Sequence, residues 1–204
     1  MDAENPKIIV IGINHNTSTV AEREKYQVNK KEIRYALSFI FSMHGVEGIV
    51  IVSTCNRLEF YLALNQDIDP VSVINEFYCK YKNIKPIINQ NQFYIYEGIE
   101  TVKHLFKVAA GLDSMLIGEY QVLGQIKDAY SIACSEKTAT KVLHKLFHNA
   151  FRISKTIRAK TRIGSNNQSL SGIALKIIKE KMKKEDVITI VGVNQNTTII
   201  AVKN

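Results

Sequence analysis

A thiol and a guanidinium stand two residues apart in the stretch IVIVSTCNRLEFYLAL, residues 49–64. Cys55 falls in a short polar step between two apolar runs, and Arg57 points to the same side of the predicted hairpin because side chains alternate along a strand. A nearby cation and the N–H groups of a tight turn favour a thiolate, and a guanidinium binds a carboxylate through two parallel hydrogen bonds. The stretch therefore predicts a nucleophile beside a carboxylate-binding group, with a surface Arg57 paired to Glu59 as the alternative.

Polar side chains also gather in the stretch GLDSMLIGEYQVLGQIKDAY, residues 111–130. Two glycines break the helical pattern here, and Gln121 and Gln125 share one helical face because they are four residues apart. Ser114 and Glu119 precede this helix, where polar residues often act as caps. The stretch predicts either a substrate-binding wall or a capped helix start.

Two histidines are candidates for acid–base chemistry, since an imidazole titrates near neutral pH. His104 lies in the helical stretch VKHLFK, and His15 lies in the loop NHNTST. A single helical histidine is more often a partly buried surface residue, and the sequence does not set its distance from Cys55. The roles of both histidines therefore stay open.

The cysteines and the apolar runs exclude several classes of protein. Cys55, Cys79 and Cys134 are odd in number and lack Cys-x-x-Cys spacing, which argues against a disulfide framework and against structural zinc. Cys79 and Cys134 fall inside predicted helices, where a cysteine usually serves packing. No apolar run approaches the roughly 18 residues of a spanning helix, and the start MDAENPK is unlike a secretory signal. We expect a cytoplasmic protein without membrane contact.

The formal net charge of +8 is concentrated toward the C-terminus. Residues 1–136 hold 13 Lys and Arg against 16 Asp and Glu, whereas residues 137–204 hold 14 against 3. Basic side chains recur at steps of three and four on one helical face: Lys141, Lys145, His148, Arg152 and Lys155. Such a face suits the phosphate backbone of RNA, and an exposed helix of a bundle is the alternative.

The periodicity of the first half predicts an α+β fold. The expected elements are a strand at 7–12, a helix at 29–45, two strands that pair antiparallel around residue 55, a helix at 69–82 and a strand at 91–98. This β-α-β-β-α-β order is the ferredoxin-like plan, a four-stranded antiparallel sheet with two helices on one face.

The second half reads as helical. Three consecutive helices, of which the last is long, precede a helix at 169–182 and a short strand at 187–191 that resembles the first strand of a Rossmann-type domain. We expect a ferredoxin-like part at 1–98, a helical part with the long basic helix at 99–163, and the truncated start of a nucleotide-binding domain at 164–204.

Taken together, these motifs resemble one family, glutamyl-tRNA reductase. The resemblance rests on GINHNTSTVAEREKY, STCNRLEFY, GLDSMLIGEYQVLGQIKDAY and AFRISKTIRAKTRIG, which follow the family's order and spacing over nearly the whole chain. It implies NADPH-dependent reduction of glutamyl-tRNA to glutamate-1-semialdehyde, the first step of tetrapyrrole (porphyrin and heme) biosynthesis. Cys55 would attack the aminoacyl ester and hold the glutamate as a thioester, which hydride reduces more easily than an ester.

The resemblance also assigns the other site residues. Thr54, Asn56 and Arg57 fall on the family's substrate-binding turn, with Arg57 as the candidate for the glutamate side-chain carboxylate. Its substrate-recognition segment is matched by Ser114, Glu119, Gln121 and Gln125, and His104 matches a histidine important for activity. The NADPH phosphate turn would comprise Gly192, Val193, Asn194, Gln195, Asn196 and Thr197.

This last turn departs from the family pattern, because it keeps only the first glycine and a side chain at the second hinders close approach of pyrophosphate. The family continues through the rest of a nicotinamide-binding domain and a C-terminal helical domain that forms a homodimer, and its product passes to a semialdehyde aminomutase. We therefore expect a truncated chain that forms the thioester, or hydrolyses the ester, but does not reduce it.

Two other classes of function remain open from the sequence. A non-catalytic RNA-binding module would use the sheet and the basic helix, and would need exposed aromatic side chains to stack bases. A cysteine hydrolase or thiol redox protein would need a base such as His104 or a resolving thiol, and neither Cys79 nor Cys134 is placed to serve as one.

Overall fold

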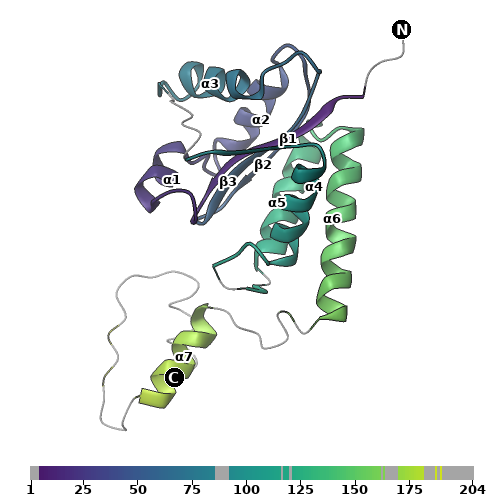
Figure 1. The fold of residues 1–204 in the computed structure, drawn as a ribbon. Helices are drawn as coiled ribbons and strands as arrows, with labels where there is room; N and C mark the ends of the chain where they lie inside the picture. The colour runs from purple at the N-terminus through teal and green to yellow at the C-terminus, as the bar shows by residue number, and fades with distance from the viewer. Residues whose placement is uncertain are drawn as a thin grey trace.

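The chain forms one antiparallel sheet with helices on both of its faces (Figure 1). This computed structural model describes residues 5–85, 92–115, 117–119, 121–161, 163, 170–181, 187 and 189. The elements are β1 (Lys7–Asn14), α1 (Val20–Tyr26), α2 (Ile33–Phe41), β2 (Val46–Ser53), β3 (Arg57–Leu64), α3 (Pro70–Lys80), β4 (Tyr94–Glu97), α4 (Ile99–Ala110), α5 (Gln121–Ser135), α6 (Lys141–Lys160) and α7 (Leu170–Lys181).

The sheet has the strand order β2-β3-β1-β4 with every neighbouring pair antiparallel, so the ferredoxin-like prediction is confirmed. β1 lies between β3 and β4, which places Gly12 opposite Glu59 on one side and Tyr94 on the other. A Cβ added at Gly12 would lie 2.8 Å from the Glu59 side chain and 2.9 Å from the Tyr94 hydroxyl. The glycine therefore leaves the space in which those two side chains meet.

Helices cover both faces of the sheet. On one face, Phe60 of β3 packs against Phe77 and Tyr78 of α3. On the other face, Tyr61 of β3 packs edge-on against Phe147 of α6. Every residue of β3 is buried, because a strand covered on both sides has no solvent face and reads as a continuous apolar run.

The sequence prediction lacked the helix α1. It expected the segment NTST to be part of a loop that leads to the helix at 29–45. Thr19 caps α1 by accepting a hydrogen bond from the Glu22 N–H, and the Glu22 carboxylate accepts one from the Thr19 N–H. This Thr-x-x-Glu capping box is the sequence signal that identifies the helix.

The loop between α5 and α6 closes the outer edge of β2. The Ile49 N–H donates to the Thr138 carbonyl at 2.8 Å, and the Thr138 hydroxyl donates to the Ile49 carbonyl at 3.0 Å. Gly48 permits this approach, since a Cβ there would lie 2.5 Å from the Thr140 hydroxyl oxygen. The helical part and the sheet consequently share one apolar core.

The long helix α6 has the two faces that its sequence predicts. Leu143, Leu146 and Ala150 are buried, whereas the five basic side chains, from Lys141 to Lys155, are all exposed. The predicted helix at 169–182 corresponds to α7, and the predicted strand at 187–191 lies, apart from residues 187 and 189, outside the described residues. The divisions after residues 98 and 163 stay predictions. Of the described helices, none is long and apolar enough to cross a membrane.

Candidate active site

Cys55 sits at the tip of the β2–β3 hairpin, and its side chain is exposed. The turn is fixed by Thr54, whose hydroxyl oxygen accepts hydrogen bonds from the N–H groups of Asn56 and Arg57 at 3.2 and 3.1 Å. The Thr54 N–H in turn donates to the Arg57 carbonyl at 2.8 Å. A hydroxyl that satisfies two turn amides holds the backbone in one conformation, so the thiol is presented at a defined position.

The loop between β1 and α1 docks onto the same turn. The Nε of Arg23 donates to the Cys55 carbonyl at 3.2 Å, and its Nη1 donates to the Ser18 carbonyl at 2.6 Å. The His15 N–H donates to the Asn56 carbonyl at 3.0 Å. Through these contacts, the segment that follows β1 holds the turn around residue 55 in place.

Cys55 and Arg57 line one cavity of about 140 Å³. Its other walls come from α1, the turn and the start of β3: Val20, Arg23, Glu24, Gln27, Thr54 and Leu58. Cys55 therefore shares a pocket with two arginines, Arg23 and Arg57. An arginine beside a thiol suits an anionic acyl group, because a guanidinium binds a carboxylate.

Arg57 differs from the surface residue of the alternative interpretation, because its side chain is only 2% exposed. Its Nη1 donates to Glu59 Oε1 at 2.7 Å and to Asp113 Oδ2 at 3.1 Å, and its Nη2 donates to the Asp113 carbonyl. Burial opposes the charged form, yet the negative charge of Glu59 outweighs it and raises the pKa of Arg57. Pairing with Glu59 is thus present, but inside the protein and together with Asp113.

Glu59 is the centre of a buried polar cluster. Its carboxylate is inaccessible to solvent and accepts hydrogen bonds from the hydroxyls of Tyr61 at 2.7 Å and Tyr94 at 2.5 Å. The His104 Nε2 lies 2.8 Å from Glu59 Oε1. Burial alone would raise the pKa of Glu59, but the Arg57 charge and the hydrogen bonds from His104 and Tyr94 prevail and lower it. The cluster therefore holds one carboxylate ionised beneath the hairpin.

The same burial and the Glu59 charge raise the pKa of Tyr94 and of Tyr61 well above that of free tyrosine, so both hydroxyls keep their protons and act as donors. The His104 ring contacts Glu59, and Glu59 contacts Arg57. His104 is therefore linked to the hairpin through these two side chains.

His15 is the histidine whose backbone N–H bonds to the Cys55 turn. Burial, assisted by the Arg57 and Arg23 charges and opposed by Asp113, lowers the pKa of His15. Its Nδ1 is buried without a hydrogen-bond partner among the described atoms. A neutral ring with an unused nitrogen fits a proton acceptor better than a structural histidine.

The loop between α4 and α5 supplies Asp113 and Ser114. Asp113 binds Arg57, and the Ser114 hydroxyl next to it is buried with no partner in the part of the chain that the structure describes. Arg158 of α6 anchors this loop by donating to the carbonyls of Gly118 and Glu119 at 3.1 and 2.8 Å. Partial burial raises the pKa of Glu119.

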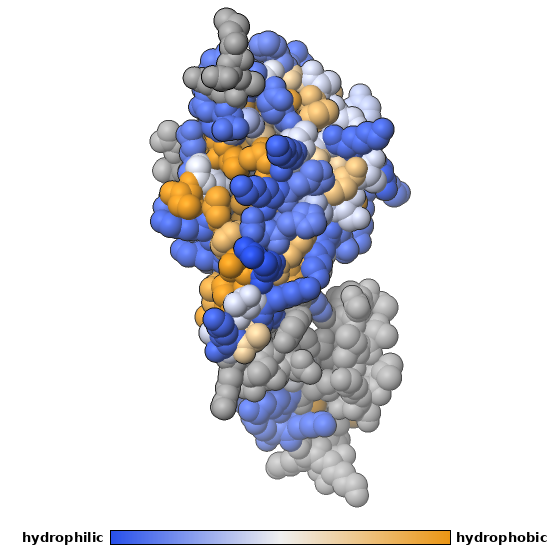
Figure 2. Space-filling view, turned by 90° about the vertical axis from the view of Figure 1, so that its right-hand side faces the viewer, coloured by the Kyte–Doolittle hydropathy of each residue, from blue (hydrophilic) through white to orange (hydrophobic). Residues whose placement is uncertain are grey.

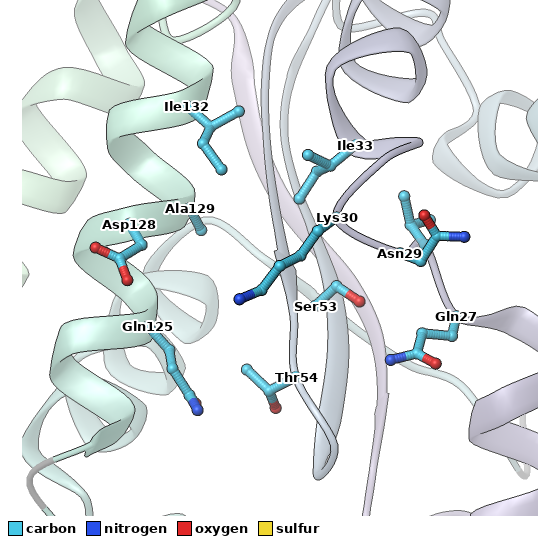
Figure 3. Close-up of a pocket in the computed structure, with 11 residues that line it drawn as sticks. Gln27, Asn29, Lys30, Ile33, Ser53, Thr54, Gln125, Asp128, Ala129 and Ile132 are labelled. Carbon is cyan, nitrogen blue, oxygen red and sulfur yellow. The ribbon is translucent and has the colours of Figure 1, made fainter. Parts of the chain in front are cut away.

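Gln121 and Gln125 lie one turn apart on the exposed side of α5, as their spacing predicts. Gln125 also lines a cavity of about 380 Å³ together with Ser53 and Thr54, which precede the thiol (Figure 3). Among the side chains placed in the site by sequence, the turn residues, Arg57, His104 and Gln125 are connected by contacts or shared cavities. Ser114 is next to Asp113 in sequence, and no described contact joins the side chains of Ser114, Glu119 or Gln121 to the turn. The six residues assigned to NADPH, 192–197, lie outside the described residues.

Sequence reasoning missed four residues of this site: Arg23, Glu59 as a buried anchor, Tyr94 and Asp113. Glu59 carries a signal, since a carboxylate within a largely apolar strand is rarely buried without partners. Cys79 also differs from its predicted packing role, because its side chain on α3 is exposed.

The fold and the site define an α+β domain that presents a single exposed thiol at the tip of a hairpin above a buried ionic cluster. A family model described as the N-terminal domain of glutamyl-tRNA(Glu) reductase matches residues 11–161. The chain therefore belongs to the glutamyl-tRNA reductase family.

Individual relatives agree with this assignment. A glutamyl-tRNA reductase of Thermodesulfovibrio yellowstonii is 41% identical over 180 residues, which are 85% of this chain and 42% of the relative. One of Carboxydothermus hydrogenoformans is 39% identical over 171 residues, 83% of this chain and 38% of the relative. The solved structure of the glutamyl-tRNA reductase from Methanopyrus kandleri matches with a TM-score of 0.67 at 27% identity, over 86% of this chain and 40% of that chain. The chain thus spans about two fifths of the length of these proteins.

Proposed function

We propose that this chain is the acyl-accepting part of a glutamyl-tRNA reductase. Cys55 attacks the ester carbon of glutamyl-tRNA, so that an Sγ–C bond forms and the C–O bond to the ribose breaks. The ribose oxygen leaves with the proton that the thiol gave up, and the glutamyl group stays on Cys55 as a thioester. The observation that carries this proposal is the exposed thiol on an immobilised turn, in one cavity lined also by Arg23 and Arg57.

The residues around the thiol take distinct roles in this proposal. His15, whose pKa is lowered and whose backbone is bonded to the turn, takes the role of acceptor for the thiol proton. Arg57 or Arg23 binds the side-chain carboxylate of the glutamyl group in the shared cavity. His104 acts as a positioning residue, because it holds Glu59, and Glu59 holds Arg57. Ser114, with its unpartnered hydroxyl, and Gln125 contribute polar contacts to the substrate.

The exposed basic face of α6 is proposed to contact tRNA phosphates. Figure 2 shows the side of the molecule that α6 forms, where hydrophilic side chains lie among apolar ones. Lysine and arginine side chains that neutralise phosphates make binding depend steeply on salt. Arg152→Glu is expected to weaken tRNA binding and flatten its salt dependence.

Reduction by NADPH, dimerisation and transfer of the product to an aminomutase belong to the proposed role of the whole protein. The residues assigned to NADPH lie outside those that the structure describes. The chain is expected to form the thioester without reducing it, and semialdehyde formed by these 204 residues with NADPH would contradict that expectation.

The test is mass spectrometry of the chain after it is mixed with glutamyl-tRNA. We expect a glutamyl mass on the peptide that contains Cys55, and its loss in Cys55→Ser. Cys79→Ser is the matched control, because Cys79 is also an exposed thiol but lies on α3. Unchanged activity of Cys55→Ser would favour a non-catalytic RNA-binding module, and rapid release of free glutamate would favour a hydrolase.

A further inference from the structure

A second cavity adjoins the thiol on the other side of the hairpin turn. It has a volume of about 380 Å³ and lies between the segment that leads into α2 and the helix α5. Thr54 and Gln27 line both this cavity and the smaller one of about 140 Å³ that contains Cys55. The two cavities therefore meet at the residue that precedes the nucleophile.

The larger cavity has an apolar floor and a polar rim. The floor consists of Val28, Ile33, Ala129 and Ile132, and the rim consists of Gln27, Asn29, Lys30, Ser53, Thr54, Gln125 and Asp128. Figure 3 shows Lys30 extending across the cavity toward the helix that carries Gln125 and Asp128. An apolar floor with a few converging polar groups is the usual composition of a small-molecule site.

Unused hydrogen-bonding groups face this cavity. The Ser53 hydroxyl is buried and has no partner among the described atoms. The backbone adds further groups, because alternate residues of a strand direct their N–H and C=O to the same side. Ile49 bonds outward to Thr138, so Ser53, which lines the cavity, directs its backbone groups outward as well. A buried polar group without a partner calls for an explanation, and a bound ligand is one group that would satisfy it.

We propose that this cavity binds the terminal adenosine of the charged tRNA, an inference that rests on the proposed function. The glutamyl group is attached to the ribose of that adenosine, so the nucleoside must lie next to Cys55 when the ester is attacked. The cavity that contains Cys55 has about 140 Å³ and is lined by Arg23 and Arg57, which suits the small anionic acyl group. The neighbouring cavity has more than twice that volume and suits the nucleoside.

Each part of the nucleoside finds a chemical partner. The base lies on the apolar floor, where a flat ring can stack on aliphatic side chains, with the amides of Gln27 and Asn29 at its edge. The Asp128 carboxylate accepts from the free ribose hydroxyl, and the Lys30 ammonium binds the 5′-phosphate. Breaking of the ester bond then leaves the RNA held at this site while the acyl group stays on the thiol.

The test compares three acyl donors: glutamyl-tRNA, the glutamyl ester of adenosine 5′-monophosphate, and the ethyl thioester of glutamate, which lacks a nucleoside. The rate of Cys55 acylation is measured by mass spectrometry for the 204-residue chain and for Lys30→Ala and Asp128→Ala. Loss of one charge-assisted hydrogen bond should slow acylation about tenfold with the two nucleoside donors and leave the ethyl thioester unaffected. Adenosine 5′-monophosphate should inhibit acylation by the nucleoside donors.

Lys31→Ala is the matched control, because Lys31 is an exposed lysine next to Lys30 that does not line the cavity. Equal slowing with all three donors, or no slowing with any, would overturn the adenosine site. If the unaltered chain is acylated by none of them, the proposed function fails and the adenosine site fails with it. Acylation that ignores Lys30 and Asp128 refutes the adenosine site alone.

Discussion

His104 Nε2 lies 2.8 Å from Oε1 of Glu59, and the same carboxylate oxygen lies 2.7 Å from Arg57 Nη1. A helix on one face of the sheet is thereby linked, through a single buried carboxylate, to the strand that begins at the nucleophile turn. The position of the Arg57 guanidinium therefore depends on Glu59.

Replacing the buried carboxylate should destabilise the protein strongly. Glu59→Gln leaves the Arg57 guanidinium buried with only Asp113 to balance its charge, and loss of one partner of a buried ion pair costs about 3–5 kcal/mol. Urea unfolding measures this change. The control is Glu76→Gln, which breaks the exposed Lys80–Glu76 pair and should change stability by less than about 1 kcal/mol. Equal effects of the two substitutions would contradict the central role of Glu59.

Acid should weaken the fold through the same carboxylate. The folded state holds the pKa of Glu59 below its ordinary value of 4.5, because Arg57 and the hydrogen bonds outweigh burial. The resulting stability is fully present above the unfolded pKa and is lost as pH falls below about 4.5, by up to about 1.4 kcal/mol per pH unit for one proton. Urea midpoints between neutral pH and pH 3 measure this slope. A slope that is just as steep in Glu59→Gln would refute the assignment.

The Arg23 guanidinium should matter for the reaction more than for folding. Arg23→Lys cannot reproduce both the hydrogen bond to the Cys55 carbonyl and that to the Ser18 carbonyl, so the turn loosens. We expect about a tenfold slower acylation of Cys55, with a loss of about 1 kcal/mol in stability. Arg34→Lys, at an exposed arginine on α2, should change neither. Unaltered acylation in Arg23→Lys would show that the turn is held by other contacts.

Thr54 should be needed for its hydroxyl rather than for its shape. Thr54→Val keeps the volume but leaves the N–H groups of Asn56 and Arg57 without their acceptor, which costs about 1–3 kcal/mol. Thr54→Ser restores the acceptor and should recover most of that loss. Hydrogen exchange of the two amides, with urea unfolding, provides the measurement. Similar behaviour of the valine and serine variants would contradict the proposed turn.

Two glycines give opposite predictions for the same substitution. Gly48→Ala places a Cβ 2.5 Å from the Thr140 hydroxyl oxygen and should destabilise by about 1–3 kcal/mol. Gly124→Ala lies in α5 with nothing within 4 Å of the new Cβ, and should stabilise by about 0.5–1 kcal/mol. Thermal unfolding of both variants tests the docking of the helical part on the β2 edge, and a neutral Gly48→Ala would argue against it.

Sequence reasoning captured the elements whose apolar period is unambiguous. The β2–β3 hairpin, the helix α3 behind its Asp69 cap and the two faces of α6 follow from local patterns and local chemistry. The helix α1 was missed because Asn, Thr and Ser are common in loops, and its capping box carried the information instead.

The environment of Arg57 lay beyond local patterns. Its partner Asp113 is 56 residues away in sequence. Its other partner, Glu59, is held by His104 of the helix α4, 45 residues from Glu59. Alternation along β3 predicts the face of the sheet to which Arg57 points. Because helices cover both faces, that face lies in the protein interior and not in solvent. Which charges meet there is decided by how the layers pack.

The contact between Thr138 and Ile49 has a practical consequence for shortening this chain. A fragment that stopped before α5 would leave the N–H and C=O of Ile49 uncovered on an outer strand, beside a sheet face stripped of its helices. Such an edge is a template on which strands of other molecules add, and aggregation follows. Expression of a soluble minimal fragment should therefore require every residue through the end of α6.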